Sequence, residues 1–208
     1  QTPSVTNWHH YNKLKRPGDM RLLSLQAAAH GADAIQFFQI RRGRGACEKY
    51  HGAVIDHAGR DDTRVFLEVE ALGKELMDLK DAFLEGRTPS ETAIVFDWDN
   101  WWAVEYSAGP SVLIKYLDAV QDYYTAAFEQ NVPVDIISVE DDLSPYKVVI
   151  APLLYMTKAG YANKVNQYVD GGGTFITTFF SGIVDEHDLV FEGGYPGELR
   201  DVLGIWVE

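Results

Sequence analysis

The chain has 208 residues, of which 46% are hydrophobic and 24% charged, and this ordinary globular composition excludes a disordered, collagen-like or disulfide-stapled protein. A net charge of -13 makes sequence-independent binding to phosphates unfavourable, so no nucleic acid is expected as a partner. Cys47 is the only cysteine, which excludes an internal disulfide and a zinc site built on several thiolates.

A cytoplasmic location is expected from three features. A lone cysteine fits a reducing compartment, no apolar run is long enough to span a membrane, and no export signal opens the sequence. No membrane partner is therefore expected. Because the chain starts with Gln1 rather than Met, inside a dense motif, we expect it to be cut from a longer polypeptide.

The first part of the chain is basic and the remainder is strongly acidic. Residues 1–60 hold nine Lys or Arg against four Asp or Glu, whereas residues 61–208 hold nine against 27. This uneven distribution favours two functional regions.

The first region predicts a helix, a strand and a second helix. Met20, Leu23, Ala27 and Ala28 recur at helical spacing, which indicates a helix over residues 20–30. The apolar run at residues 34–40 indicates a strand covered on both faces, and a polar loop follows it.

The second helix of this region is expected to begin after Asp61 and Asp62, which supply a cap and negative charge in the first turn. Apolar side chains mark one face of that helix as far as Gly86. The turn-rich residues 85–90 then mark a domain boundary, which gives domains over residues 1–88 and 91–208.

Strands and helices alternate in the second region. The expected strands are residues 93–96, 134–139, 147–151 and 174–179. One helix is expected from Pro110 to about residue 130, and a second is expected after a cap at Thr157. Such alternation predicts an open parallel α/β domain of the flavodoxin-like or Rossmann-like kind.

Three motifs resemble catalytic or phosphate-binding elements only superficially. The glycines at residues 171–173 follow a helix and precede a strand, so they are interpreted as a helix-ending turn. The arginine-rich loop at residues 41–45 lacks a Lys-Ser or Lys-Thr ending and fits a mobile or substrate-lining loop better. Cys47 has His51 four residues away, but no local signature supports a nucleophile and base pair.

The densest polar cluster lies in the loop after the first expected strand. Glu48 can accept hydrogen bonds from sugar hydroxyls, and His51 can donate or accept them. Trp8 offers an aromatic face that could stack on a pyranose. A solvated turn for the first two residues, and a core position for Trp8, remain the alternatives.

Three of the five tryptophans, Trp98, Trp101 and Trp102, cluster after the first strand of the second region. Tryptophan is enriched at interfaces, so the cluster indicates a ligand cleft or a subunit interface. The alternative is an aromatic corner packed under the next helix.

The sequence also resembles the β-galactosidases of glycoside hydrolase family 42. The resemblance rests on Thr-Pro-Ser-Val-Thr-Asn-Trp and Phe-Asp-Trp-Asp-Asn-Trp-Trp, with four shorter motifs between them. Together these occupy residues 2–8, 13–18, 30–33, 51–54, 56–57 and 96–102. Beyond about residue 140 the similarity is looser.

The resemblance implies the C-terminal portion of a (β/α)8 barrel over residues 1–88, followed by an α/β trimerisation domain over residues 91–208 that is incomplete at its C-terminus. It implies a homotrimer that hydrolyses terminal β-D-galactosides with retention and without a cofactor, and no metal site is expected within these 208 residues. Trp8, Glu48 and His51 are then expected to bind galactose, and Trp98, Trp101 and Trp102 to lie at the interface.

The resemblance also implies that this chain holds neither catalytic glutamate. The nucleophile is expected immediately before Gln1, the acid/base glutamate further upstream, and the 208 residues alone are expected to be inactive. A non-catalytic oligomerisation module and a flavodoxin-like small-ligand binder remain as alternatives, and the lack of a phosphate loop weighs against the second.

Overall fold

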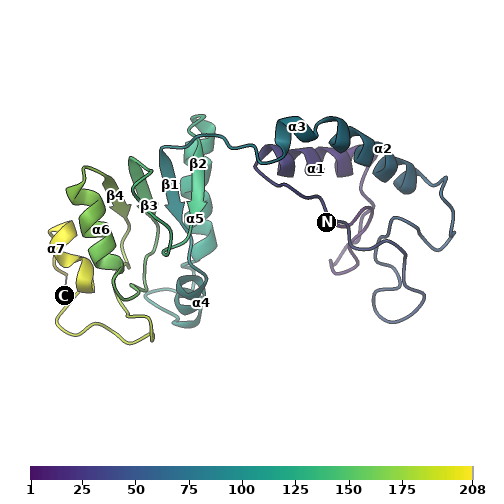
Figure 1. Ribbon diagram of the computed structural model, residues 1–208. Helices are drawn as coiled ribbons and strands as arrows, with labels where there is room; N and C mark the ends of the chain where they lie inside the picture. The colour runs from purple at the N-terminus through teal and green to yellow at the C-terminus, as the bar shows by residue number, and fades with distance from the viewer. Residues whose placement is uncertain (208) are drawn as a thin grey trace. The chain divides into compact units, whose positions relative to one another are not determined.

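The computed structural model describes residues 1–207 and divides the chain into two compact units, Gln1–Thr88 and Pro89–Glu208 (Figure 1). Each unit has its own helices, and the sheet belongs to the second. No helix within residues 1–207 is long and apolar enough to cross a membrane.

The helices of the first unit are α1 (Asp19–Ala29), α2 (Arg64–Asp78) and α3 (Lys80–Phe83). The predicted first helix is confirmed, and the residues that it buries are Met20, Ser24 and Ala28, whereas Leu23 and Ala27 are exposed.

The expected cap at Asp61 and Asp62 is also wrong, because α2 begins one residue after Thr63. The Thr63 hydroxyl accepts a hydrogen bond from the Phe66 N–H at 3.4 Å, which satisfies one of the free amides of the first turn.

The prediction of a strand at residues 34–40 is wrong, because no continuous ladder of hydrogen bonds forms there. The segment bonds to the start of the chain, where the Phe38 N–H donates to the Gln1 carbonyl at 2.9 Å, and to residues 54–55, where the Ile55 N–H donates to the Ile40 carbonyl at 2.8 Å. A single bridge between Arg41 and Ile55 follows. The segment therefore lies beside both the chain start and residues 54–55, without a continuous partner strand.

The second unit contains a four-stranded sheet of β1 (Thr92–Val95), β2 (Val134–Ile137), β3 (Val148–Ala151) and β4 (Thr174–Thr177). The strand order is β2-β1-β3-β4, and every pair is parallel. Ile94 of the central strand β1 pairs with Ile136 on one side and Ile150 on the other. The predicted parallel α/β architecture is confirmed.

Helices cover both faces of this sheet because β1 is apolar on both. Ile94 packs in one core with α4 (Trp98–Tyr106) and α5 (Tyr116–Glu129). Ala93 and Val95 point the other way and pack in a second core with α6 (Tyr161–Asp170). The 3-10 turn η1 (Gly197–Leu199) adds Leu199 to the second core, and α7 (Arg200–Leu203) follows it beside α6 (Figure 1).

Two helix starts in the second unit differ from the sequence prediction. Pro110 lies in a bend, and α5 begins only at Tyr116, because the extended backbone of Lys115 interrupts helical geometry just before it.

The Thr157 cap is wrong as well: Gly160, with a φ of 80°, precedes α6. The glycine turn at residues 171–173 is confirmed as the end of that helix.

The connections of the sheet leave β1 and β3 in opposite directions. The chain passes from β1 through α4 and α5 to β2 at one edge, and from β3 through α6 to β4 at the other. The carboxyl ends of β1 and β3 therefore flank the switch point, where open α/β sheets bind ligands.

Candidate functional site

Two loops of the first unit are joined by the side chain of Asn7, which contacts residues 40 and 44 positions further along the chain. Its Nδ2 donates to the Cys47 carbonyl at 2.7 Å, and its Oδ1 lies 2.9 Å from His51 Nδ1. The segment that carries Trp8 is thereby tied to both ends of the loop that carries Glu48.

Gly52 brings the same two segments into backbone contact. Its N–H donates to the Val5 carbonyl at 2.7 Å. A Cβ at this position would collide with Ser4 Oγ and with the Val5 backbone nitrogen, so only glycine fits. The structure therefore brings together the segments of the three predicted substrate-binding residues.

Their exposures differ in a way that suits different contacts. Trp8 is 58% exposed and presents an aromatic face, whereas His51 is only 6% exposed, with the Phe38 ring set edge-on at 5.2 Å. Glu48 is half-buried. Its main-chain carbonyl accepts a hydrogen bond from the His51 N–H at 2.9 Å. An exposed ring beside anchored polar groups can hold a ligand with one apolar face and several hydroxyls.

Two sequence alternatives for this loop find no support in the geometry. Arg42 is used internally, since Nε donates to the His51 carbonyl at 2.8 Å and Nη2 to the Tyr50 carbonyl at 3.4 Å. The imidazole of His51 meets Asn7, and no hydrogen bond within residues 1–207 joins it to the exposed thiol of Cys47. Sequence reasoning missed the anchoring roles of Arg42 and Asn7.

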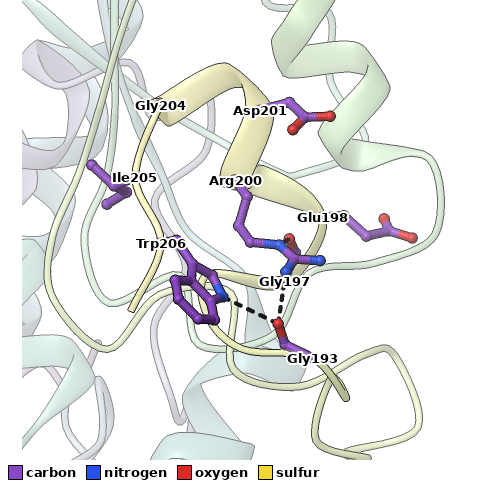
Figure 2. A pocket seen from close by; sticks show the side chains of 8 residues that line it. All are labelled: Gly193, Gly197, Glu198, Arg200, Asp201, Gly204, Ile205 and Trp206. Atoms are coloured by element: carbon purple, nitrogen blue, oxygen red, sulfur yellow. Dashed lines mark hydrogen bonds between the residues drawn. The ribbon is translucent and has the colours of Figure 1, made fainter. Parts of the chain in front are cut away.

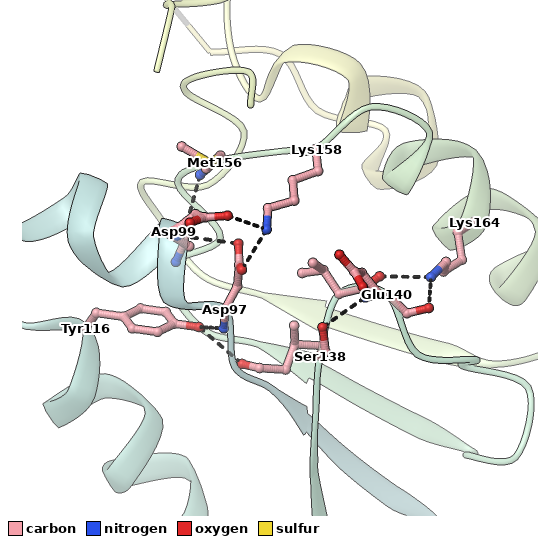
Figure 3. A network of polar contacts seen from close by, with 11 residues as sticks. Asp97, Asp99, Tyr116, Ser138, Glu140, Met156, Lys158 and Lys164 are labelled. Atoms are coloured by element: carbon pink, nitrogen blue, oxygen red, sulfur yellow. Dashed lines mark hydrogen bonds and ion pairs between the residues drawn. The ribbon is translucent and has the colours of Figure 1, made fainter. Parts of the chain in front are cut away.

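The carboxyl end of β1 in the second unit holds a buried polar network (Figure 3). Asp97 caps α4 by accepting from the Asn100 N–H at 3.4 Å, and its other carboxylate oxygen lies 2.9 Å from Lys158 Nζ. Lys158 also pairs with Asp99 at 2.7 Å. Burial alone would lower the pKa of Lys158, but its hydrogen bonds to Asp99 and Asp97 outweigh burial and hold that pKa above its usual value.

Asn100 is fully buried and joins α4 to the loop after β3. Its Nδ2 donates to the Leu153 carbonyl, and its Oδ1 accepts from the Met156 N–H, both at 2.8 Å. Tyr116 adds a bond from its hydroxyl to the Val95 carbonyl at 3.3 Å, and burial raises the pKa of that hydroxyl to about 12. The network joins α4 to β1, the loop after β3 and α5, with no nucleophile beside a base.

Helix α4 divides the tryptophan cluster into an outer and an inner part. Trp98, Trp102 and Tyr106 follow one another at four-residue spacing and are 57%, 60% and 90% exposed. We call these three side chains the aromatic stripe. Trp101 is half-buried against Phe96, with ring centroids 6.0 Å apart, and its Nε1 donates to Glu105 at 2.8 Å.

Two cavities open on the second unit. One of about 490 Å³ lies beside the aromatic stripe and is lined by Trp102, Ala103, Glu105, Tyr106 and Asp188. The other, of about 760 Å³, is formed by the last segment of the unit and is lined by Gly193, Gly197, Glu198, Arg200, Asp201, Gly204, Ile205 and Trp206 (Figure 2).

The larger cavity does not resemble a catalytic site. Arg200 Nη1 donates to the Gly193 carbonyl at 2.7 Å, and Trp206 Nε1 donates to the same oxygen at 3.1 Å (Figure 2). These donors are therefore satisfied within their own loop. Across residues 1–207, no group of three or more His, Cys, Asp or Glu side chains is placed to hold a metal ion.

The fold defines a two-unit chain with a parallel α/β sheet in its second unit, and comparisons with known proteins define its family. Residues 90–208 match the family model described as the β-galactosidase trimerisation domain, and residues 1–79 match the model described as β-galactosidase. The chain belongs to the β-galactosidases of glycoside hydrolase family 42, as the sequence motifs predicted.

Relatives align along nearly the whole chain but are about three times longer. Beta-galactosidase BgaA of Planococcus sp. (strain 'SOS Orange') is 62% identical over 208 residues, covering 100% of this chain and 31% of the relative. Beta-galactosidase LacZ of Lactobacillus acidophilus is 50% identical over 206 residues, covering 99% and 31%. The chain thus spans about 31% of the length of these relatives.

Solved structures agree with this assignment. The crystal structure of beta-galactosidase from Bacillus circulans sp. alkalophilus matches with a TM-score of 0.92 and 60% identity over 100% of this chain and 31% of that one. The beta-galactosidase of the haloarchaeon Halorubrum lacusprofundi matches with a TM-score of 0.83 and 30% identity, covering 99% and 30%. The predicted fold class is confirmed.

Replacing Asn100 by Ala is expected to destabilise the second unit by roughly 2–4 kcal/mol, because it leaves the Leu153 carbonyl and the Met156 N–H buried without partners. Urea unfolding of the 208-residue chain, followed by circular dichroism, measures the loss. Asn163→Ala is the matched control on the exposed side of α6, and it is expected to change stability by less than about 0.5 kcal/mol. Equal effects of the two substitutions would contradict the role given to Asn100.

Proposed function

We propose that the parent protein is a retaining β-galactosidase that hydrolyses terminal non-reducing β-D-galactosides, and that residues 1–88 supply part of its galactose subsite. The observation that carries the proposal is the joining of the Trp8 segment to the Glu48 and His51 loop through Asn7 and Gly52. The names of relatives that are 62% and 50% identical support it.

Galactose has the shape and the groups that this loop pair can recognise. The C–H face of the pyranose would stack on the exposed ring of Trp8. Glu48 and His51 would then contact the hydroxyls at the ring edge, with the buried imidazole held in place by Asn7. Such contacts fix the sugar so that its anomeric carbon faces the catalytic groups.

Retention requires two carboxyl groups about 5–5.5 Å apart. One carboxylate attacks the anomeric carbon while the other, as an acid, protonates the departing glycosidic oxygen; water then releases the sugar with the second group as base. The family resemblance implies a binding role for Glu48, the only glutamate in residues 1–60. On the same resemblance we propose that both catalytic glutamates lie upstream of Gln1.

The second unit would serve assembly of a homotrimer, in keeping with the trimerisation-domain family of residues 90–208. The aromatic stripe on α4 is the surface we assign to the interface, because three large rings at four-residue spacing are exposed there. Trp101 would support the stripe from beneath, since it packs on Phe96. We also propose a cytoplasmic location, which the single cysteine supports.

Hydrolysis of a chromogenic β-galactoside by the full-length parent tests the activity. Turnover is expected, and it is expected to collapse by at least about a thousandfold when the residue before Gln1, expected to be Glu, is changed to Gln. Proton NMR of the first-released sugar should show the β-anomer. An absence of turnover in the parent would instead favour a non-catalytic oligomerisation module.

Trp8→Ala in the parent is expected to raise KM and lower kcat/KM by roughly 5- to 30-fold, because about 1–2 kcal/mol of stacking is lost. Steady-state kinetics on the same galactoside measures the change. Tyr11→Ala is the control, since Tyr11 is an even more exposed aromatic in the same loop. Unchanged kinetics for Trp8→Ala would remove it from the subsite.

Trp102→Ala is expected to weaken the trimer by at least tenfold in dissociation constant, because truncating a central interface tryptophan costs about 2 kcal/mol or more. Sedimentation velocity over a dilution series of the parent measures the trimer fraction. Phe128→Ala, an exposed aromatic on α5 outside the stripe, is the control and should leave the trimer intact. An undiminished trimer for Trp102→Ala would place the interface elsewhere.

A further inference from the structure

We propose that Asn7 is a positioning residue that fixes His51 as the Nδ1–H tautomer, so that Nε2 can only accept a hydrogen bond from a substrate hydroxyl. The inference rests on the proposed galactose subsite and adds to it the direction of one contact. Asn7, the residue before Trp8, would thus set the protonation of His51, which lies 44 positions further along the chain.

The tautomer follows from the partners of the Asn7 amide. One end of this amide lies 2.7 Å from the Cys47 carbonyl, which can only accept, so that end must be the NH2 group. The other end is then the amide oxygen, which also can only accept. His51 Nδ1 lies 2.9 Å from it and must carry the proton. In the neutral imidazole, Nε2 is left without a proton.

Three further contacts hold the ring in this orientation. The imidazole is 6% exposed and meets the Phe38 ring edge-on at 5.2 Å. Arg42 holds the main chain on either side of the Tyr50–His51 peptide by donating to both carbonyls. The His51 N–H is itself bonded to the Glu48 carbonyl at 2.9 Å. The ring therefore has little freedom to rotate and exchange its nitrogens.

A specificity rule follows for the ligand. The Glu48 carboxylate accepts hydrogen bonds, and with Asn7 in place His51 Nε2 accepts as well. The ligand must therefore donate to both, which hydroxyl groups do. Fluorine at the same carbon cannot donate, so a deoxyfluoro sugar would fill the space of the hydroxyl without making the bond.

The tautomer can be measured without any turnover. The full-length parent carrying 15N-labelled histidine is examined by magic-angle-spinning NMR, with His51→Gln used to assign the His51 signals. We expect a protonated Nδ1 and an unprotonated Nε2 in the parent, and a signal shifted to protonated Nε2 or to a mixture in Asn7→Ala. Asn7→Asp, which keeps an acceptor for Nδ1–H, should preserve Nδ1 protonation. A protonated Nε2 with unprotonated Nδ1 in the unsubstituted parent would overturn the proposal.

Kinetics test whether Asn7 acts through His51. Asn7→Ala is expected to raise KM for the galactoside by about tenfold with a smaller change in kcat, and to cost clearly less in a His51→Ala background, where only its separate bond to the Cys47 carbonyl is still lost. Asn12→Ala is the matched control in the same loop, since its side chain accepts from the His9 N–H at 3.1 Å. Fully additive losses from Asn7→Ala and His51→Ala would overturn the proposal.

Deoxyfluoro galactosides substituted singly at carbons 3, 4 and 6 identify the hydroxyl. At the position that donates to His51, the fluoro compound should bind no better than the deoxy compound, and Asn7→Ala should weaken its binding less than it weakens binding of the parent galactoside. An Asn7→Ala loss of the same size with every analogue would count against the assigned direction. Should the parent hydrolyse no galactoside at all, the NMR result still stands by itself, so failure of the function and failure of the tautomer assignment are distinguishable.

Discussion

The contact between Gly52 and Val5 is the constraint on which the proposed galactose subsite of the first unit depends. The backbone of Gly52 approaches so closely that a side chain would strike Ser4 and Val5, and the hydrogen bond of 2.7 Å closes the approach. Only with these segments in contact can the amide of Asn7 reach both Cys47 and His51. A single glycine thus permits an arrangement in which one asparagine orders an aromatic platform and two polar groups.

The second unit places its polar groups at the switch point of its sheet but uses them for a different purpose. Asp97, Asn100 and Lys158 occupy the place where other open α/β sheets bind ligands, yet each is engaged with another residue of the same unit. Their common effect is to fix α4 onto the sheet. The polar residues at the switch point therefore fix the orientation of α4 and, with it, the aromatic stripe. In related folds the same part of the sheet binds ligands.

Much of the fold could be predicted from apolar periodicity, because the strands of the second unit are short apolar runs between turns. Helix α4 could not, since Trp-Asp-Asn-Trp-Trp has no amphipathic pattern and the helix is held by the Asp97 cap and the buried amide of Asn100. The strand at residues 34–40 failed for the opposite reason: its composition is right, but strands need partners that composition does not reveal. In the site, residue types indicated Trp8, Glu48 and His51. Asn7 acts through contacts with a segment 40 or more residues away, and Arg42 through main-chain carbonyls within its own loop, and no local pattern encodes either role.

The charge of the chain constrains how copies could meet. Each copy carries a net charge of -13, so association must gain enough from apolar burial to overcome mutual repulsion. The aromatic stripe offers that burial, since its three rings are uncharged and exposed. Glu105 and Asp188 line the cavity beside the stripe, and Asp99 lies on the same helix. Two copies that brought these carboxylates face to face would repel each other. The carboxylates would therefore favour the orientation in which the aromatic rings make contact.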